Sequence, residues 1–406
     1  MNKLIITHMQ CRGQKCLVTA METDGKLVSL QLENPQKEQL LGSIHVGKVQ
    51  KVLPNINAAF VEIENRIPCF FSYTKENNIV FRNEKNTQEI RPGDELLVQV
   101  TKEAIKTKAP SVSSNINFNG NYLVLTTGNR KIGFSSKLTT AQKEILKDIL
   151  DEVFSEERSF GVIVRTNAKE ASIEQLISEY RQLKQELESV LHRGKFNPCY
   201  TKIKEGNSSI EDKLKNVYWE TLDKIVTDDS YIYQSVLDVK NKLYPHLSCE
   251  VQFYQDKLLP LYKLYSLESG LDQALSEKVW MKSGGFLIIQ QTEAFVVIDV
   301  NSGKNSSKKD ASEEYKKINL EAAKEIARQL RLRNLSGSIL IDFINMQQYE
   351  DKTELISVMK HLVKQDRIQT TVVDVTGLGI MELTRKKVEK SLLEQWKGLT
   401  GGVNIE

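Results

Sequence analysis

The sequence predicts an α/β protein that is built from several subdomains. Three observations predict this class. Short apolar runs that are typical of strands follow one another within about the first hundred residues. A long amphipathic helix is predicted to begin near residue 172. In the last third of the chain, apolar strands alternate with helical patterns, which is typical of a sheet flanked by helices.

The first hundred residues are predicted to be mostly strand. Residues 1–38 contain the apolar runs LIITHM and KCLVTAM, and Asp24-Gly25 is a typical hairpin turn. From residue 42, GSIHVGKVQKVLPNINAAFVEI predicts two strands separated by a Pro-Asn turn, and FFSY and ELLVQVTK predict two more. Short strands at this spacing are typical of a small barrel.

The middle of the chain is predicted to mix both kinds of element. Residues 104–120 are polar and basic, so we expect an exposed loop there. NYLVL and FGVIVRT are predicted strands on either side of a helix at 141–154, and 211–275 mixes helices with the strand EVQFY. Ser172 and Gln175 fit a capping box at the start of the long helix. The buried stripe of that helix is predicted at Ile173, Leu176, Ile177, Tyr180, Leu183 and Leu187.

The last third is predicted to be one α/β unit. VWMKSGGFLIIQ predicts a strand pair that turns at Gly284-Gly285, and AFVVIDV is expected to be a further buried strand. SILIDF is the next strand, with predicted helices at 313–333 and 352–365. In such units functional residues gather at the carboxyl ends of strands.

Composition sets broad limits on the class of protein. At 406 residues the chain is long enough for two to four domains, and 40% hydrophobic with 27% charged residues is ordinary for a soluble protein. The net charge of +3 neither demonstrates nor excludes a nucleic-acid partner, because 56 basic and 53 acidic side chains can lie on different faces.

Cysteine usage and hydropathy indicate a reducing, aqueous compartment. The five cysteines are scattered with no CxxC spacing, so neither a disulfide framework nor a structural zinc site is expected. The N-terminal MNKLIITHMQ does not resemble a signal peptide, and no run approaches the roughly 20 apolar residues that span a bilayer. We therefore expect a cytoplasmic protein with no membrane segment.

Two aspartates follow apolar strands in the last third. Asp299 ends the run in FVVIDVNSGK, and Asp342 ends the run in SILIDFINM. One such aspartate is more often a loop cap or the partner of a lysine. Two of them on strands of one α/β unit repel each other if they converge, unless a divalent cation lies between them. Oxygen ligands suit Mg²⁺ or Mn²⁺ better than zinc, and such an ion promotes phosphodiester hydrolysis. Asn301 can orient one of the carboxylates.

These segments resemble the ribonuclease E/G family. The resemblance is carried, in order, by KSGGFLIIQQTEAFVVIDVNSGK, INLEAAKEIARQLRLRNLSGSILIDFINM and TGLGIMELTRKK, and it extends over nearly the whole chain. It implies an RNase-H-like scaffold with an inserted OB-type RNA-binding barrel and a 5′-sensor region, followed by a DNase-I-like α/β nuclease subdomain. The implied ranges are 1–38 with 211–275 for the scaffold, 39–114 for the barrel, 115–210 for the sensor region, 276–400 for the nuclease subdomain and 401–406 for a tail.

The resemblance also implies an activity and a set of roles. The activity is that of a Mg²⁺-dependent endoribonuclease, with Mn²⁺ as an alternative ion. It would act on single-stranded RNA in the processing or decay of rRNA, tRNA or mRNA, with stimulation by a 5′-monophosphate. The matched positions are Asp299 and Asp342 for the metal ligands, Asn301 for the asparagine that positions one of them, Phe60 and Phe70 for base contacts, Lys108 for a lysine near the cut, and Arg165, Thr166, Gly120 and Val124 for the 5′-monophosphate pocket.

Four of the assignments outside the two aspartates have a plainer alternative. Without the family, Phe60 and Phe70 are more often barrel core, Arg165 is more often a surface arginine, and Lys108 is more often a solvated loop charge. Strand alternation can instead turn Phe60 outward, where base stacking is worth roughly 1–3 kcal/mol. A guanidinium beside a hydroxyl suits a terminal phosphate.

The sequence departs from the family in two places. The usual DFIDM reads DFINM, so that Asn345 lowers the local negative charge by one, although we still expect activity. The family's CPxC zinc link is missing, so no zinc is expected and the protein is either a monomer or a homo-oligomer without that link. The alternative function is a non-catalytic RNA-binding or ribosome-assembly factor that keeps the fold.

Overall fold

The chain forms two compact units in the computed structural model. The first unit contains residues 1–37, 218–237 and 246–406, and the second contains 38–217 and 238–245. None of the helices in the described part of the chain is long and apolar enough to cross a membrane. The structure describes residues 1–34, 40–74, 78–83, 85, 87–104, 109–135, 138–153, 159–206, 210, 214, 217, 219–245, 247–303 and 311–399.

The first unit contains a five-stranded sheet in the order β15-β14-β1-β2-β3. β1 runs antiparallel to β2 and parallel to β14, so strands that precede and follow the second unit in the sequence belong to one sheet. The predicted hairpin turn is confirmed, because Asp24 (φ 48°) and Gly25 (φ 76°) both adopt the positive φ of a tight hairpin turn. The strands are β1 (Asn2–Cys11), β2 (Gln14–Thr23), β3 (Lys26–Glu33), β14 (Lys224–Thr227) and β15 (Glu250–Phe253). The nearby helices are α4 (Ser230–Leu243), α5 (Leu261–Leu264) and α6 (Leu267–Leu275).

The second unit contains the predicted barrel. Its strands follow the order β4-β5-β6-β8-β7, and the pairing of β4 with β7 closes the five-stranded ring, while β13 adds to the outside of β4. Alternate residues such as Ala59, Val61 and Phe71 fill the interior. The strands are β4 (Ile44–Leu53), β5 (Ala58–Glu62), β6 (Pro68–Ser72), β7 (Glu95–Lys102), β8 (Ser111–Ser113) and β13 (Lys202–Lys204).

The predicted exposed loop at 104–120 is wrong for its second half. β8 closes the barrel between β6 and β7, and β9 (Asn117–Asn119) joins the neighbouring sheet. Val112, Ile116 and Phe118 are buried there. Each alternates with serine or asparagine, which is the pattern of a half-buried strand, and long-range pairing outweighs the polar composition.

A four-stranded sheet in the order β11-β12-β10-β9 completes the second unit together with two helices. The capping box is confirmed, because Gln175 N donates to Ser172 Oγ (3.3 Å) and Ser172 N donates to Gln175 Oε1 (2.8 Å). Ile173 is 45% exposed, so its predicted burial is wrong: it lies in the first turn, ahead of the buried stripe that begins at Leu176. The remaining elements are β10 (Leu123–Thr126), β11 (Ile132–Phe134), β12 (Gly161–Val164), α1 (Thr140–Val153) and α2 (Ile173–Phe196).

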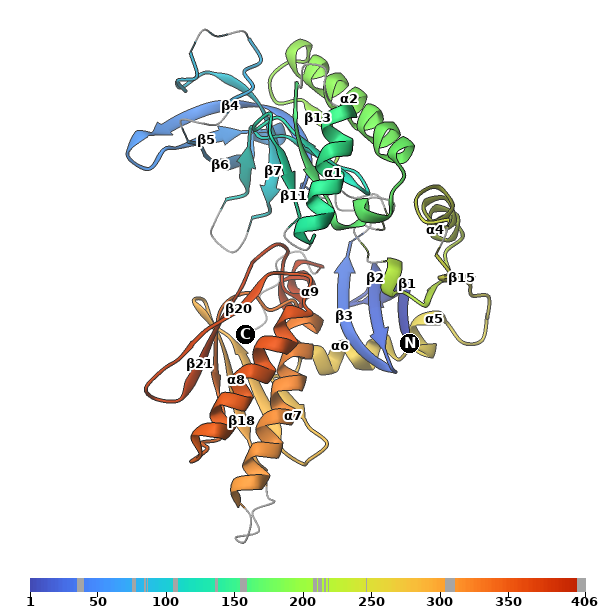
Figure 1. Cartoon of the computed structure of the whole chain (residues 1–406), viewed down its shortest axis with the longest axis vertical. Coiled ribbons are helices and arrows are strands. Elements are labelled where there is room, and N and C mark those ends of the chain that lie inside the picture. Colours follow the sequence, from blue (N-terminus) through green and yellow to red (C-terminus); the bar gives the residue numbers. More distant parts are fainter. Residues whose placement is uncertain are drawn as a thin grey trace. The chain divides into compact units, whose positions relative to one another are not determined.

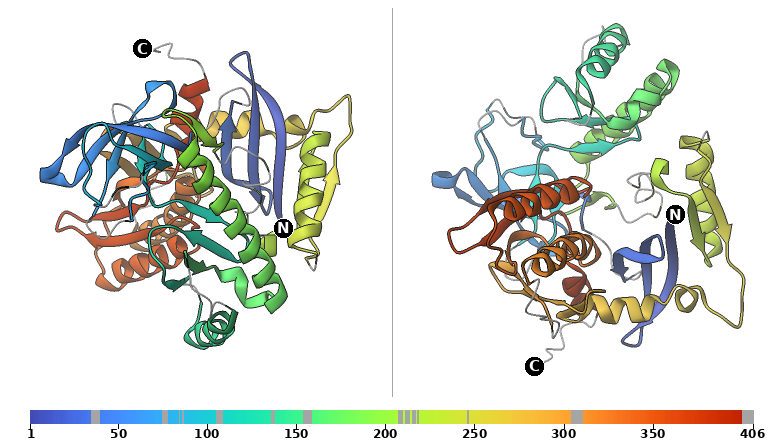
Figure 2. Two further views of the ribbon diagram at one scale, coloured as in Figure 1. Left: turned by 90° about the horizontal axis from the view of Figure 1, so that it is seen from above. Right: turned by 60° about the horizontal axis from the view of Figure 1, so that its bottom comes forward.

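The last third of the chain forms a six-stranded sheet in the order β16-β17-β18-β19-β21-β20. Helices α7 (Ala311–Leu332) and α8 (Tyr349–Lys364) pack side by side against one face of it (Figures 1 and 2). The strand pair predicted to turn at Gly284-Gly285 is confirmed. The other elements are β16 (Lys278–Trp280), β17 (Phe286–Gln291), β18 (Phe295–Asn301), β19 (Gly337–Asp342), β20 (Thr370–Val375), β21 (Ile380–Arg385) and α9 (Leu392–Leu399).

The expectation that AFVVIDV is a buried strand is only half right. Val296, Ile298 and Val300 of β18 are buried in the core under α7 and α8. Phe295 (45% exposed) and Val297 (36%) lie on the opposite face, which the helices do not cover. Asp299 belongs to this second, exposed face.

Candidate active site

The two strand-end aspartates lie side by side. Asp299 of β18 pairs directly with Asp342 of β19 in the parallel register of the six-stranded sheet. Neighbouring strands are about 4.8 Å apart, and residues in direct register point to the same face. Both side chains are exposed, on the face opposite α7 and α8. The carboxylates are therefore close to each other and open to solvent.

An asparagine holds one of these carboxylates. Asn301 Nδ2 donates a 2.8 Å hydrogen bond to Asp299 Oδ2. Within the described residues, neither Asp299 nor Asp342 has a cationic partner, and no third histidine, cysteine or acidic residue joins them in a cluster that could hold a metal ion. Two like charges at this separation repel, and a divalent cation would remove the repulsion. The donor set of carboxylate oxygens with room for water fits Mg²⁺ or Mn²⁺.

Backbone packing fixes the position of Asn301. A Cβ atom on Gly285 would lie 2.8 Å from the Asn301 carbonyl oxygen, and one on Gly303 would lie 2.4 Å from the Gly284 oxygen. Gly303 also has a φ of +71°, which L side chains rarely adopt. The glycine turn between β16 and β17 therefore lies directly against the end of β18.

A buried residue outside the predicted set fixes the chain after Asp342. Asn319 of α7 is fully buried. Its Nδ2 donates to the Ile344 carbonyl (2.7 Å), and its Oδ1 accepts from the Ile344 N–H (3.1 Å). Asn345, the departure from the family pattern, is exposed next to this pair of bonds. Sequence reasoning missed Asn319, and the only signal was an amide on the apolar side of a helix.

The two predicted barrel aromatics form one half-buried pair. Phe60 and Phe70 are directly opposite each other on β5 and β6, with ring centroids 6.1 Å apart and ring planes at 73°. Both are half-buried, whereas their neighbours Ala59, Val61, Cys69 and Phe71 are fully buried in the barrel core. The two rings therefore lie on the outside of the barrel, and the core alternative is wrong.

Lysines flank this aromatic pair. Lys51 is opposite Phe60 on β4. On the other side Ser111 is opposite Phe70, and Lys102 is opposite Ser111. Both lysines are exposed. The predicted Lys108 lies outside the described residues. The outer surface of the barrel thus combines aromatic rings with positive charge, as nucleic-acid-binding surfaces do.

Three of the predicted sensor residues are brought together at the end of β12. Arg165 Nη1 donates to the Gly120 carbonyl (2.6 Å), and its backbone N–H donates to the Tyr122 carbonyl (2.7 Å). Thr166 Oγ1 lies 3.0 Å from Ser135 Oγ. Val124 is further along β10, opposite the exposed Ile163, rather than in this hydrogen-bonded group.

A half-buried glutamate that the sequence did not reveal shapes this group. The Glu179 carboxylate accepts three consecutive backbone N–H bonds, from Asn121 (2.5 Å), Tyr122 (2.8 Å) and Leu123 (2.8 Å). A Cβ on Gly120 would lie 2.5 Å from its carboxyl carbon. Burial raises the pKa of Glu179 above its usual value, against the lowering effect of the three N–H groups and Arg165. Glu179 therefore holds the segment to which Arg165 binds.

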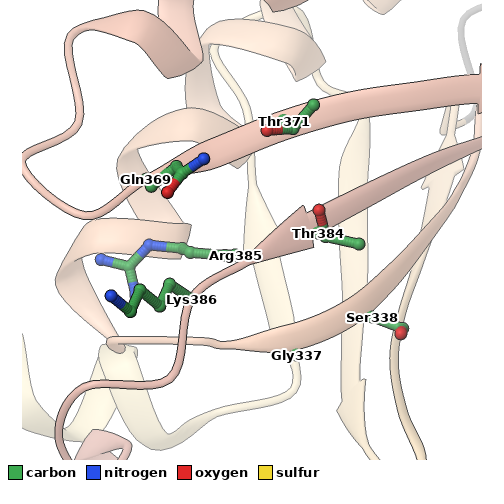
Figure 3. Close-up of a pocket in the computed structure, with 7 residues that line it drawn as sticks. All are labelled: Gly337, Ser338, Gln369, Thr371, Thr384, Arg385 and Lys386. Atoms are coloured by element: carbon green, nitrogen blue, oxygen red, sulfur yellow. The ribbon is translucent and has the colours of Figure 1, made fainter. Parts of the chain in front are cut away.

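The six-stranded sheet also carries a cavity of about 330 Å³ that is lined by other residues. Ser338, Thr384 and Thr371 face it from three neighbouring strands (Figure 3). Arg385 lines it too, but its guanidinium donates to Asp366 (2.8 Å) and is buried. None of the predicted site residues lines this cavity.

Comparison with known proteins identifies the family of this chain. The model of the ribonuclease E/G family matches residues 117–388, about two thirds of the chain. The chain belongs to the ribonuclease E/G family. The predicted resemblance is thereby confirmed. The matched range contains the group around Arg165 and both aspartates of the six-stranded sheet.

Individual members of the ribonuclease E/G family align over most of the chain. Ribonuclease G of Haemophilus influenzae is 31% identical, over 92% of this chain and 78% of its own length. Ribonuclease G of Escherichia coli K12 is 30% identical, over 91% of this chain and 77% of its own length. Ribonuclease E of Haemophilus influenzae is 29% identical over 97% of this chain, which corresponds to 42% of that longer protein.

Proposed function

We propose that the protein is a metal-dependent endoribonuclease that cuts single-stranded RNA, with Asp299 and Asp342 as the metal-binding residues of its active site. The observation that carries the proposal is the direct pairing of these two exposed carboxylates on neighbouring strands. The relatives named ribonuclease G and ribonuclease E support an activity on RNA. Within the family pattern we propose that β1–β3 with β14 and β15 form the RNase-H-like scaffold, the barrel the OB-type domain, β9–β12 with α1 and α2 the 5′-sensor region, and β16–β21 the DNase-I-like subdomain.

The chemistry follows from what each side chain can do. Asp299 and Asp342 would hold Mg²⁺ or Mn²⁺ through carboxylate oxygens, and the Asn301 amide keeps Asp299 in a fixed orientation. When bound, such an ion supplies Lewis acidity to a phosphate oxygen and to a water molecule. The exposed sheet face gives an extended RNA strand access to the carboxylates.

One assay distinguishes the proposed nuclease from the alternative, a non-catalytic RNA-binding protein. A labelled single-stranded oligonucleotide is incubated with the purified chain and either Mg²⁺ or Mn²⁺. We expect discrete internal cuts that disappear when the ion is chelated, with little cutting of the same sequence in a duplex. Binding that persists in both ions without any cut would support the alternative and contradict the nuclease proposal.

The outer surface of the barrel is proposed to bind bases. Phe60 and Phe70 offer half-exposed rings, and Lys51 and Lys102 place positive charge on both sides of them. Such a row can stack bases and attract the phosphates between them, largely without regard to sequence.

Removing either ring should weaken RNA binding. We expect Phe60→Ala and Phe70→Ala each to raise the Kd for single-stranded RNA by about 5- to 150-fold, because stacking on one base is worth about 1–3 kcal/mol. Fluorescence anisotropy in the presence of a chelator measures this change without cleavage. Phe196→Ala is the matched control, because Phe196 is 72% exposed at the end of α2 in the same unit. An equal Kd in all four proteins would contradict the proposal.

The group around Arg165 is proposed to recognise a 5′-monophosphate. Arg165 and Thr166 follow each other directly after β12; the guanidinium binds the Gly120 carbonyl, and the Thr166 hydroxyl lies within hydrogen-bond distance of Ser135. Gly120 and Val124 belong to the adjoining segment. A guanidinium forms charge-assisted hydrogen bonds with phosphate, and a hydroxyl adds a further donor.

A further inference from the structure

A lysine and two aromatic side chains cluster on the first two strands of the six-stranded sheet. Lys278 and Trp280 of β16 and Phe286 of β17 form a lysine–aromatic cluster at the edge of the six-stranded sheet. Lys278 Nζ lies 4.0 Å from the centroid of the Trp280 ring and 3.8 Å from that of Phe286. The two ring centroids are 5.2 Å apart. The ammonium group is therefore held against both rings through cation–π contacts.

Strand register places this cluster beside the aspartates. Trp280 pairs with Phe286, and Phe286 pairs with Asn301. In the next row Lys278 pairs with Ile288, and Ile288 pairs with Asp299. Paired residues share a face, and each strand adds about 4.8 Å, so the backbone of Lys278 is about 10 Å from that of Asp299. The cluster and the carboxylates share the face that α7 and α8 leave open.

Among the described residues, neither core packing nor an ion pair accounts for the exposed Trp280 and Lys278 side chains of this cluster. Trp280 is 64% exposed and lies outside the core under α7 and α8. Lys278 is also exposed and forms no ion pair with any residue in the described part of the chain. The two aromatic rings hold the Lys278 ammonium group without neutralising its charge. The cluster therefore offers a fixed positive charge next to an exposed indole ring.

We propose that this cluster is an RNA subsite next to the catalytic carboxylates. Lys278 contacts a backbone phosphate of the strand being cut, and Trp280 stacks on a base of the same strand. The inference rests on the proposed nuclease function. Charge complementarity favours RNA over an apolar protein partner, because an apolar surface would strip water from Lys278 without supplying a negative charge.

The phosphate contact is tested through the salt dependence of binding. For single-stranded nucleic acid the slope of log K against log salt changes by about 0.7 for each phosphate neutralised. We expect Lys278→Gln to reduce the magnitude of this slope by about 0.7, and Lys278→Arg to retain it. The probe is a 5′-hydroxyl single-stranded oligonucleotide in the presence of chelator, which avoids both cleavage and the Arg165 group. Lys360→Gln is the matched control, because Lys360 is exposed on α8, on the covered side of the sheet, and should leave the slope unchanged.

The stacking contact is tested by fluorescence and by affinity. The chain has three tryptophans, of which Trp219 is buried and Trp280 is the most exposed. RNA should therefore quench the emission of the unaltered chain, and Trp280→Phe should lose most of the quenching. We expect Trp280→Ala to raise the Kd by about 5- to 150-fold and Trp280→Phe to restore most of the affinity. Thermal unfolding of each variant checks that the fold is kept.

The outcomes separate this inference from the nuclease proposal. If the unaltered chain binds and cuts RNA but Lys278→Gln and Trp280→Ala both behave like Lys360→Gln, the subsite is overturned and the nuclease proposal stands. If the unaltered chain neither binds nor cuts RNA, both are overturned. If Trp280→Ala changes the oligomeric state in sedimentation and leaves RNA affinity unchanged, the cluster binds a second copy of the chain, which also overturns the subsite.

Discussion

Replacing Asp299 or Asp342 by asparagine is expected to lower the rate of RNA cleavage by at least about 100-fold. Loss of a residue that only orients a metal ligand commonly costs about 10- to 100-fold, and loss of a ligand should cost more. The substitution keeps the size of the side chain but removes the charge that would hold the cation. RNA binding should change only a few-fold, because the barrel surface is untouched. Single-turnover cleavage and anisotropy in chelator measure the two effects separately.

Asp374→Asn is the matched control for these two variants. Asp374 is an exposed carboxylate on β20 of the same sheet, opposite Glu382, and its replacement makes the same change in charge. We expect nearly unaltered cleavage from it. A higher Mn²⁺ or Mg²⁺ concentration at half-maximal rate in the Asp299 and Asp342 variants would support a ligand role. Cleavage at the unaltered rate by both variants would contradict the assignment.

Replacing Arg165 by glutamine should remove most of any preference for 5′-monophosphorylated RNA. A hydrogen bond to a charged group contributes about 1.5–3 kcal/mol, so the preference should fall by about 10- to 150-fold. The measurement compares kcat/KM for RNAs that differ only at the 5′ end, with a monophosphate, a triphosphate or a hydroxyl. Cleavage of the hydroxyl RNA should change little.

Two controls separate recognition from folding for Arg165. Arg181→Gln makes the same change on the exposed side of α2 in the same unit and should leave the preference intact. Because Arg165 also donates to the Gly120 carbonyl, thermal unfolding must show that the variant keeps its fold. An unaltered chain that cuts all three RNAs equally would show that this group is not a sensor.

Local signals explain most of what could be predicted about the fold. The Ser172–Gln175 capping box and the Asp24-Gly25 turn depend on residues that are close in sequence, and both are present as predicted. The prediction failed at 111–119, where β8 exists because β6 and β7 offer it partners from about 40 and 10 residues away. Polarity alone does not reveal such partners.

The candidate site also contains residues that local sequence patterns could predict and residues that they could not. The apolar runs before Asp299 and Asp342 were sufficient to select both residues. The sequence also predicted that Asn301 orients one carboxylate, and the structure contains a hydrogen bond from Asn301 to Asp299. The outward direction of Phe60 and Phe70 was open, because alternation has two possible phases until one face of a strand is covered. Glu179 and Asn319 could not be selected, since their partners are 56 to 58 and 25 residues away in sequence.

The sequence by itself determined the α/β class, the local ends of helices and turns, the family, and the pair of strand-end carboxylates. Only the tertiary structure decided that these carboxylates are direct neighbours on an exposed face, and that Lys278 and Trp280 share this face. The physical reason is that strand register and the coverage of a sheet by helices depend on contacts between segments far apart in the chain, and these contacts leave no local pattern.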